Sequence, residues 1–449
     1  MNEINIPIGA KAILQGLKWA HYDAFLVGGC VRDGLMGVKP KDWDICTSAT
    51  PDEMKAFFAS HGVRTIDTGI KHGTITANME EAGCFEVTTF RIDGSYSDGR
   101  HPDEVKFTDN IEQDLSRRDF TINAMACNED GLVDPFGGVN DLKNKIIRCV
   151  GNPDERFEED ALRILRAMRF SAIYNFSIEE KTSLAIHQNK DKLLRISAER
   201  IQSEITKMIC GKNILQVLLD YSDVIAVVFP EMNKCIGFNQ NNRFHQYDVY
   251  EHIAHAVSNY TGKDPIVAMT LLLHDIGKPD CYTVDHKGGH FHGHGARSHD
   301  ISSNILTRLR FDNKSKRQIL ELVLYHDSVI EPTMKTVCRW LNKIGQVQFE
   351  RLLDVRMADI KAHSIDTQAS RIERCNSLRV ICDEVIRQQQ CFQLKDLAID
   401  GHDVMCLLGI KEGPGVGSIL NEILGLVLNG DLENKRSCLV KYLKSRCPA

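Results

Sequence analysis

The stretch from residue 25 to residue 46 reads FLVGGCVRDGLMGVKPKDWDIC, and it constrains most strongly what this chain can fold into. Its apolar start predicts a short buried strand, and residues 31–33 predict the opening of a helix. Between them, Gly28 and Gly29 have no Cβ atom, so the backbone there can approach a phosphate closely. The free N–H groups at the start of a helix also favour an anion. The stretch therefore predicts a strand, a glycine turn and a helix that together accept a phosphate.

Two acidic residues, Asp42 and Asp44, end this stretch, and we expect them on a second short strand. Alternate residues of a strand point to the same face, so the two carboxylates would project together while Trp43 points away. Neighbouring carboxylates repel each other unless cations lie between them, and hard oxygen ligands suit Mg²⁺, which also binds phosphates. An isolated Asp-x-Asp is typical of a solvated loop, but its place behind two glycines is more specific. The combination predicts two-metal chemistry on a phosphoryl group.

The order strand, Gly-Gly, Arg32-Asp33, short loop, Asp-x-Asp resembles the head motif of the class II nucleotidyltransferases. This family comprises the tRNA CCA-adding enzymes and the bacterial poly(A) polymerases. The resemblance implies that the two acids hold two Mg²⁺ ions. It also implies that the residues preceding them bind the nucleotide, namely Gly28, Gly29 and Arg32.

Residues 114–126 read DLSRRDFTINAMA, and we expect a helix that begins near Asp119. An arginine pair is most often a surface feature, but arginine also suits triphosphate oxygens because its planar fork donates two hydrogen bonds. The run resembles the second motif of the same family, which implies that Arg118 contacts the nucleotide phosphates. Residues 134–142, DPFGGVNDL, resemble the hinge between head and neck in that family.

Residues 157–172, FEEDALRILRAMRFSA, predict one helix with Asp160 and Arg163 on the same face. A carboxylate and a guanidinium held side by side present acceptors and donors to the Watson–Crick edge of a base. An ordinary salt bridge on a solvated helix is the alternative. In the resembling enzymes the matching Glu-Asp-x-x-Arg selects CTP and ATP in place of a template. The resemblance implies that Asp160 and Arg163 read the base and that Arg166 and Arg169 support the nucleotide and its phosphates.

The second half of the chain is rich in histidine, and two His-Asp doublets follow apolar runs, in LLLHDIGKP and LVLYHDS. Imidazole and carboxylate together suit a divalent transition metal. The pattern resembles the HD phosphohydrolase superfamily, whose domains occur fused to some bacterial CCA-adding enzymes. A helical tRNA-binding body that retains the histidines is the alternative. The resemblance implies a metal site made of His252, His274, Asp275, His294 and either His326 or Asp327.

Two further segments resemble parts of the CCA-adding enzymes that support the nucleotide site or the tRNA. Residues 196–208 open with Ser197 as a predicted helix cap, and Arg200 there would steady the base-reading helix. In the tail, three glycines at positions 413, 415 and 417 precede a predicted helix. Backbone N–H groups exposed there would hold RNA phosphates, although a plain turn is the alternative.

Composition sets outer limits on these interpretations. The chain has 449 residues, 43% of them apolar, and a formal charge of −6, so an RNA-binding surface must be a local basic patch. No apolar run reaches the roughly 18 residues that a membrane span needs. The 15 cysteines include no C-x-x-C pair, which argues against a zinc ribbon and a disulfide scaffold. We expect reduced thiols, a cytoplasmic protein and no membrane partner; the oligomeric state stays open.

The expected fold class is α+β, with a mixed sheet in a small nucleotidyltransferase head and helices in the rest of the chain. The expected domains are the head (1–145), a neck with the nucleotide-selecting helix (146–235), a body with the HD-type site (236–395) and a tail that contacts tRNA (396–449). All of them follow the motifs above.

The predicted function is the addition of CCA to the 3′ end of tRNA from CTP and ATP, without a nucleic-acid template and by two-metal phosphoryl transfer. A poly(A) polymerase and the A-adding enzyme of a split system are alternatives, because their head motifs are nearly the same. An HD-domain phosphohydrolase with the head as an RNA-binding module is an alternative from a different class.

Overall fold

The computed structural model describes residues 5–94, 104–286, 288–387 and 393–446, and the chain divides into two compact units, residues 1–230 and 231–449. Residues 93–109 are polar and rich in Gly and Asp, so the sequence predicts an exposed loop there, and the central part of this segment lies outside the described residues. No helix among the described residues is long and apolar enough to cross a membrane.

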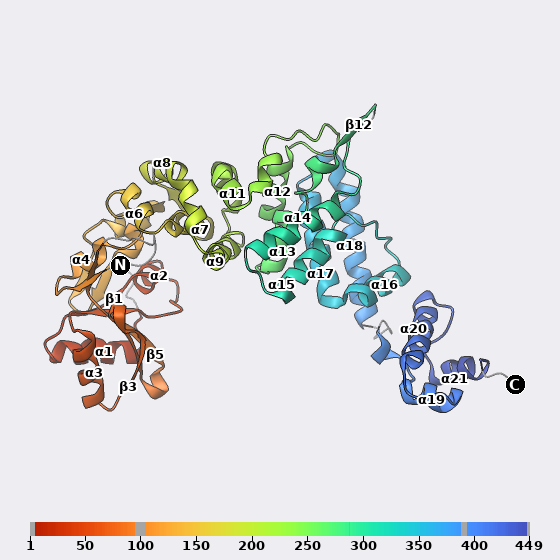
Figure 1. Cartoon of the computed structure of the whole chain (residues 1–449), viewed down its shortest axis with the longest axis horizontal. Coiled ribbons are helices and arrows are strands. Elements are labelled where there is room, and N and C mark those ends of the chain that lie inside the picture. The colour runs from red at the N-terminus through yellow and green to blue at the C-terminus, as the bar shows by residue number, and fades with distance from the viewer. Residues whose placement is uncertain (1–4, 95–103, 287, 388–392, 447–449) are drawn as a thin grey trace. The chain divides into compact units, whose positions relative to one another are not determined.

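The first unit begins with a seven-stranded mixed sheet in the order β3-β4-β5-β2-β1-β8-β9, in which β2 and β5 are parallel and the other neighbours are antiparallel. This sheet and the helices that follow confirm the predicted α+β class (Figure 1). The strands are β1 Ala24–Val27, β2 Ile45–Thr47, β3 Arg64–Gly69, β4 Thr74–Asn78, β5 Cys84–Thr89, β8 Ala126–Asn128 and β9 Gly131–Val133.

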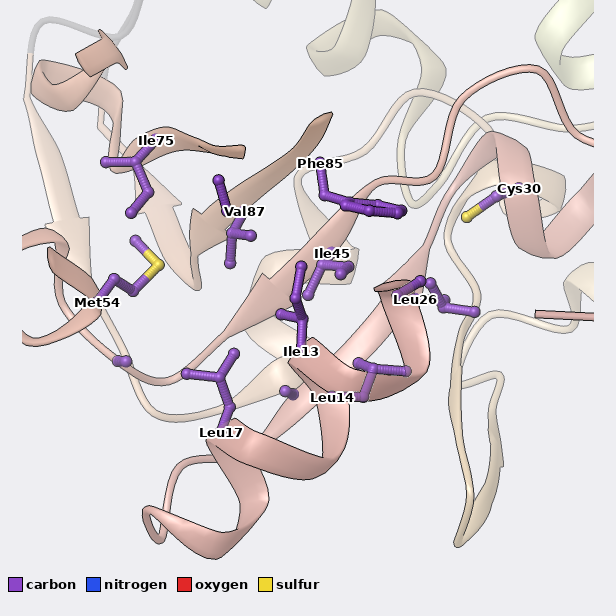
Figure 2. Close-up of a cluster of buried hydrophobic side chains, with 14 of the residues drawn as sticks. Ile13, Leu14, Leu17, Leu26, Cys30, Ile45, Met54, Ile75, Phe85 and Val87 are labelled. Carbon is purple, nitrogen blue, oxygen red and sulfur yellow. The ribbon is translucent and has the colours of Figure 1, made fainter. Parts of the chain in front are cut away.

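Two amphipathic helices, α1 (Ile8–Trp19) and α3 (Pro51–Ser60), bury their apolar side chains against the sheet. Ile13, Leu14 and Leu17 of α1 meet side chains of β1, β2 and β5 in one core (Figure 2). Helix α3 begins at Pro51, where the N-cap residue Thr50 and Glu53 form a capping box. This core fixes the strands whose ends carry the nucleotide motif.

The glycine turn joins β1 to α2 (Gly29–Leu35), as predicted. The expectation that Asp42 and Asp44 lie within a strand is wrong, because they occupy a segment without regular secondary structure just before β2. The Asp44 carbonyl there accepts a hydrogen bond from the Val27 backbone N–H at 3.0 Å. Trp43 packs against the main core of the head.

The predicted helix from Asp119 is also wrong. Helix α4 (Ile111–Ser116) ends before the arginine pair, and a short 3-10 turn, η3 (Thr121–Asn123), leads into β8. The reason is competition for backbone hydrogen bonds: the buried Asp119 carboxylate accepts from the Phe120 N–H, and the Thr121 N–H donates to the Arg148 carbonyl.

The predicted single helix at 157–172 is two helices, α6 (Pro153–Glu159) and α7 (Leu162–Tyr174). Asp160 lies between them with extended backbone angles, and its carboxylate accepts a hydrogen bond from the Leu162 N–H. The chain turns at Asp160 because its side chain caps the second helix. Asp160 and Arg163 therefore do not share a face of one helix.

The remaining elements of the first unit are short. Two small sheets pair β6 with β7 and β10 with β11. The bounds are β6 Arg91–Asp93, β7 Val105–Phe107, α5 Gly138–Asn144, β10 Ile146–Ile147, β11 Ser177–Ile178, α8 Glu180–Asn189, α9 Ala198–Met208, α10 Ile214–Asp220 and α11 Ser222–Val228.

The second unit is mainly helical and carries a small hairpin, β12 (Thr283–Asp285) with β13 (Gly288–His290). Its first helices are α12 Val249–Asn259, α13 Pro265–Leu273, α14 His294–Arg308, α15 Asn313–Tyr325, α16 Met334–Ile344, α17 Gln346–Lys361 and α18 Ile365–Arg387. Three more, α19 Gly401–Leu408, α20 Pro414–Asn429 and α21 Arg436–Lys444, have a core of their own. Gly413 precedes α20 as predicted, but Gly415 and Gly417 lie inside the helix.

Candidate functional site

The glycine turn of the head lies against two arginines. Gly28 has a φ of +74°, in the left-handed region that favours glycine, and a Cβ at that position would be 3.0 Å from Nη1 of Arg118. A Cβ at Gly29 would be 3.6 Å from Nη2 of Arg32. The absence of side chains thus leaves the backbone next to two guanidinium groups, which is an arrangement suited to a phosphate.

A buried carboxylate, Asp114, holds the arginine pair of the second motif. Its oxygens lie 2.6 Å from Nη2 of Arg117 and 3.2 Å from Nη2 of Arg118. Burial alone would raise the pKa of Asp114, but the charges of Arg118 and Arg117 outweigh burial and lower it. Sequence reasoning did not single out Asp114, although it lies three and four residues before these arginines.

Three carboxylates gather at the end of β2, where sequence reasoning expected two. Ile45 pairs with Val87 in the parallel ladder, so Glu86 of β5 lies across from Asp44. Removal of water by the surrounding protein raises the pKa of the Asp44 carboxyl group; Arg118 opposes this shift, while Glu86 and Asp42 add to it. Acids with this mutual repulsion fit hard divalent cations, which bind carboxylate oxygens. The signal available in the sequence was the acid Glu86 between the apolar Phe85 and Val87 of a strand-like run.

A chain of hydrogen bonds links Arg32 of α2 to Arg166 of α7. Arg32 is buried, and its Nε and Nη2 donate to Oδ1 of Asp33 at 2.9 and 2.8 Å. Its Nη1 donates to Asn123 at 2.5 Å, and Asn123 donates to Asp119 at 3.0 Å. Asp119 in turn accepts from Nε and Nη2 of Arg166 at 2.8 and 2.5 Å. The first two motifs and helix α7 therefore share one polar network.

Asp119 stays ionised within this network. Burial alone would raise the pKa of Asp119, but the charge of Arg166 and hydrogen bonds from Asn123 and Arg166 outweigh it and hold the pKa at about 2. A negative charge therefore anchors Arg166 at every pH near neutrality.

The two residues expected to read the base are each oriented by other partners. Asp160 accepts from Nη1 and Nη2 of Arg200 at 3.2 and 2.6 Å. Arg163 donates to Glu159 at 2.5 Å and to the Arg117 carbonyl at 3.1 Å. Both side chains are mostly buried, so they have fixed directions rather than the freedom of a solvated pair. Arg200, which the sequence predicts to steady this region, contacts Asp160, and Glu159 contacts Arg163.

A second candidate site lies in the other unit, where the structure brings together all five histidine-site residues predicted from sequence. His252 comes from α12, His274 and Asp275 follow α13, His294 begins α14 and His326 follows α15. Nε2 of His326 lies 3.5 Å from Oδ1 of Asp275, and His326 belongs to a group of possible metal ligands that does not include Asp327.

An aspartate that sequence reasoning missed completes the cluster. Oδ1 of Asp359, on α17, lies 2.9 Å from Nε2 of His252 and 3.5 Å from Nε2 of His274. Two groups of ligand atoms result, and they share Asp275. The first group contains His252, His274, Asp275 and Asp359, and the second contains Asp275, His294 and His326. A third group joins His252 to two further histidines that were not predicted, His245 and His363.

The histidine tautomers support metal binding. Nδ1 of His274, His294 and His326 each lies 2.7 to 2.8 Å from the backbone carbonyl three residues earlier. Nδ1 of each ring can therefore donate to that carbonyl, which leaves Nε2 as the atom that a metal can bind. Nε2 of His294 lies only 3.1 Å from Nε2 of His326, so a proton or a metal cation must lie between the two nitrogens. Nε2 of His274 is buried between two carboxylates, 3.2 Å from Asp275 and 3.5 Å from Asp359.

The cluster opens into a cavity of about 690 Å³ that is rich in cationic and aromatic side chains. Lys278 is buried there and lies 2.6 Å from Asp275. The cavity is also lined by Arg243, Phe244, Phe291 and Arg371. A small anion with an aromatic group would fit these walls.

Three family models match successive parts of the chain. They describe a poly A polymerase head domain at residues 24–148, a probable RNA and SrmB binding site of polymerase A at residues 175–236, and a tRNA nucleotidyltransferase domain 2 at residues 296–443. His252, His274 and His294 lie between the second and third matches.

Curated relatives match almost the whole chain. A CCA-adding enzyme of Lactobacillus delbrueckii subsp. bulgaricus is 33% identical, with 97% of this chain and 96% of the relative covered. CCA-adding enzymes of Lactobacillus helveticus and Enterococcus faecalis are each also 33% identical, and cover 98% and 97% of this chain and 97% and 95% of their own lengths.

Solved structures of CCA-adding enzymes are similar to this chain in fold. The Bacillus stearothermophilus CCA-adding enzyme in complex with CTP has a TM-score of 0.73 and 30% identity, covering 97% of this chain and 96% of its own. The Thermotoga maritima CCA-adding enzyme complexed with tRNA has a TM-score of 0.58 at 20% identity, covering 97% and 94%, and shows likeness of fold alone.

Proposed function

The chain belongs to the CCA-adding enzymes, and from this premise we propose that it adds C, C and A to the 3′ end of tRNA, using CTP and ATP and no nucleic-acid template. The single observation that carries the proposal is the match to CCA-adding enzymes over nearly the full length of both chains. These matches include the second unit and do not favour the poly(A) polymerase, split-system or hydrolase-only alternatives.

We propose that Asp42 and Asp44, together with Glu86, hold the divalent cations of the reaction, and that these are two Mg²⁺ ions. When bound, such ions activate the attacking 3′-hydroxyl and neutralise the triphosphate. Arg32 and Arg118, beside the two glycines, donate hydrogen bonds to the phosphates and stabilise the charge of the leaving pyrophosphate.

Base selection follows from the donors and acceptors that Asp160 and Arg163 offer. Cytosine and adenine both present an amino donor next to a ring-nitrogen acceptor, so a carboxylate and a guanidinium complement them. Uracil and guanine present a carbonyl where the amino group would be, and that oxygen would face a carboxylate. Arg200 and Glu159 hold the two readers in place. One pair of side chains can therefore accept C and A and reject U and G.

The test of this active site is incorporation of labelled CTP into a tRNA that lacks its 3′ CCA. Asp42→Asn and Asp44→Asn remove charge with little change in shape, and each should lower kcat at least a hundredfold while the Tm stays within about 2 °C. Asp52→Asn, in the exposed first turn of α3, is the matched control and should keep wild-type turnover. Wild-type turnover in Asp42→Asn would contradict the assignment of Asp42 as a ligand of the catalytic cations.

We also propose a second function, a metal-dependent phosphohydrolase at the histidine cluster. The observation that favours it is the set of Nδ1 protons donated to backbone carbonyls, which leaves Nε2 of three histidines for a metal. The mixed imidazole and carboxylate donors suit a divalent transition metal. Cationic side chains of the cavity, Lys278 and Arg371, would bind the substrate phosphate.

Metal analysis and phosphate release test this second function. His274→Ala and Asp275→Ala should each lose most of the bound metal and all phosphate release from a generic phosphomonoester or phosphodiester. His299→Ala, on α14 outside the cluster, should keep both. Equal metal content in the three variants would remove the basis of the proposal.

The remaining assignments are proposals of the same kind. We infer that residues 1–145, 146–235, 236–395 and 396–449 act as head, neck, body and tail, with the tail contacting tRNA. The match of a tRNA nucleotidyltransferase domain to residues 296–443 supports this role for the C-terminal part. A cytoplasmic location follows from the proposed tRNA substrate.

A further inference from the structure

One aromatic ring in the neck, Phe170 of α7, lies among three arginines. The guanidinium carbon of Arg169 is 4.4 Å from the ring centroid, that of Arg32 is 5.3 Å away and that of Arg166 is 5.5 Å away. Arg166 precedes Phe170 by one helical turn, whereas Arg32 comes from α2 in the head. All three distances fall within the range of cation–π attraction, about 6 Å.

Three like charges around one ring repel each other, so the arrangement needs compensation. Each arginine has a carboxylate of its own: Asp33 for Arg32, Asp119 for Arg166 and Glu204 for Arg169, at 2.8, 2.5 and 2.9 Å. The negative face of the ring adds attraction that all three share. Arg32 still has N–H groups for a phosphate, because it has five in all and donates three of them to Asp33 and Asn123.

The orientation of the ring is fixed from two sides. Phe120, in the second motif, meets Phe170 edge-on, with the centroids 5.7 Å apart and the planes at 89°. Tyr174, one turn further along α7, stacks on Phe170 at 5.9 Å and 22°. Tyr174 also lies 4.9 Å from the Arg32 guanidinium and donates to Asp33 at 3.4 Å. Phe170 is 5% exposed, so its ring has little room to move.

We propose that Phe170 is a positioning residue that holds Arg32, Arg166 and Arg169 as one triphosphate-binding group, with Tyr174 fixing the ring. The inference rests on the proposed nucleotidyl transfer at the head. In this proposal Phe170 touches no substrate and acts through the three arginines, which bind the triphosphate. Because CTP and ATP share the triphosphate, Phe170 serves both nucleotides equally and leaves base selection to Asp160 and Arg163.

The test replaces Phe170 by leucine, which keeps an apolar side chain but removes the ring. The KM values of CTP and ATP should both rise about tenfold, by the same factor, because each cation–π contact at a desolvated site contributes a few-fold in affinity. The inhibition constant of inorganic triphosphate should rise in parallel, while kcat and the preference over UTP stay within about twofold. Wild-type incorporation of CTP in the same assay separates failure of this inference from failure of the proposed function.

Two matched variants separate positioning from packing. Phe229→Leu removes the same atoms from an equally buried side chain of the same unit, and should lower the Tm without changing either KM. Phe170→Tyr keeps the ring and should restore the KM values to within about twofold of wild type. A Phe170→Leu enzyme with unchanged KM values and triphosphate inhibition would overturn the inference.

Tyr174 provides a second route if Phe170→Leu does not fold. Its side chain is only half-buried, so replacement is better tolerated. Tyr174→Leu should raise the inhibition constant of triphosphate about threefold, whereas Tyr174→Phe, which keeps the ring, should not. Equal inhibition constants for Tyr174→Leu and Tyr174→Phe would contradict the proposed role of the Tyr174 ring in fixing Phe170.

Discussion

The side chains proposed to read the base are held by charged partners from outside the pair. Arg200 makes two hydrogen bonds to Asp160, and Glu159 receives one from Arg163. Hydrogen bonds between charged groups are directional and strong, so they fix the angle at which each reader meets a base. The motifs in the sequence indicated that these four residues act in one region. Which side chain bonds to which became clear only from the distances between their atoms in the structure.

Removal of Arg200 should therefore affect base selection more than folding. Arg200→Ala frees the Asp160 carboxylate, and kcat/KM for CTP should fall about tenfold while misincorporation of UTP rises. Arg195→Ala, a nearby exposed arginine, is the control and should match the wild type. Steady-state kinetics with each of the four nucleotides measures both effects, and an unchanged CTP-to-UTP ratio would argue against the proposed role of Asp160.

The buried pair of Asp119 and Arg166 should make stability depend on pH in a defined window. The pKa of Asp119 is about 2, below the value of about 3.9 in an unfolded chain. The carboxylate thus stabilises the fold fully above about pH 4, and this contribution is lost as the pH falls toward 2.

Asp119→Asn should consequently cost about 3 kcal/mol in the free energy of unfolding at pH 7. The difference from the wild type should shrink below pH 4, because the wild-type carboxylate is then being protonated. Urea unfolding at a series of pH values provides the measurement. A difference that stays constant down to pH 2.5 would show that the charge of Asp119 is not what stabilises the fold.

At the scale of secondary structure, local patterns succeeded where the cause was local. The strand, the glycine turn and the helix of the first motif depend on apolar spacing and on glycine, and they lie where predicted. The breaks at Asp119 and Asp160 depend on side chains that bond to the backbone and to distant arginines. Periodicity continues through such positions, so it predicted a helix where the chain turns.

The glycine turn allows a prediction at this scale with a close control. Gly28 and Gly62 both have φ above +70°, but only Gly28 has an arginine where a Cβ would lie. Gly28→Ala and Gly62→Ala should each lose about 1 kcal/mol of stability from backbone strain. Only Gly28→Ala should also lose turnover, by at least tenfold, because its methyl group displaces Arg118.

Thermal unfolding and CTP incorporation, measured on the two glycine variants side by side, distinguish strain from crowding. Equal turnover in both variants would mean that the close approach of Gly28 to Arg118 does not matter for catalysis.

At the scale of the whole molecule, each unit carries its own candidate site. The first unit supplies the carboxylates, the arginines and the residues proposed to read the base, whereas the second unit supplies the histidine cluster. The His-Asp doublet was recognisable in the sequence, but the place of Asp359 in the cluster was not. Asp359 belongs to no local motif, and it reaches the cluster only because α17 packs against α12 and α13. The fold class was predictable from motif order, and this second acid was not.

The central claim is that one chain adds C, C and A in order and reads the bases with its own side chains. The most direct test supplies the protein with Mg²⁺, a tRNA transcript that lacks its last three nucleotides, and CTP, ATP or both, and resolves product lengths to one nucleotide. The account predicts two additions with CTP alone, three with both nucleotides, and then a stop. A long ladder with ATP alone, or addition of adenosine only to a CC-ended tRNA, would contradict it.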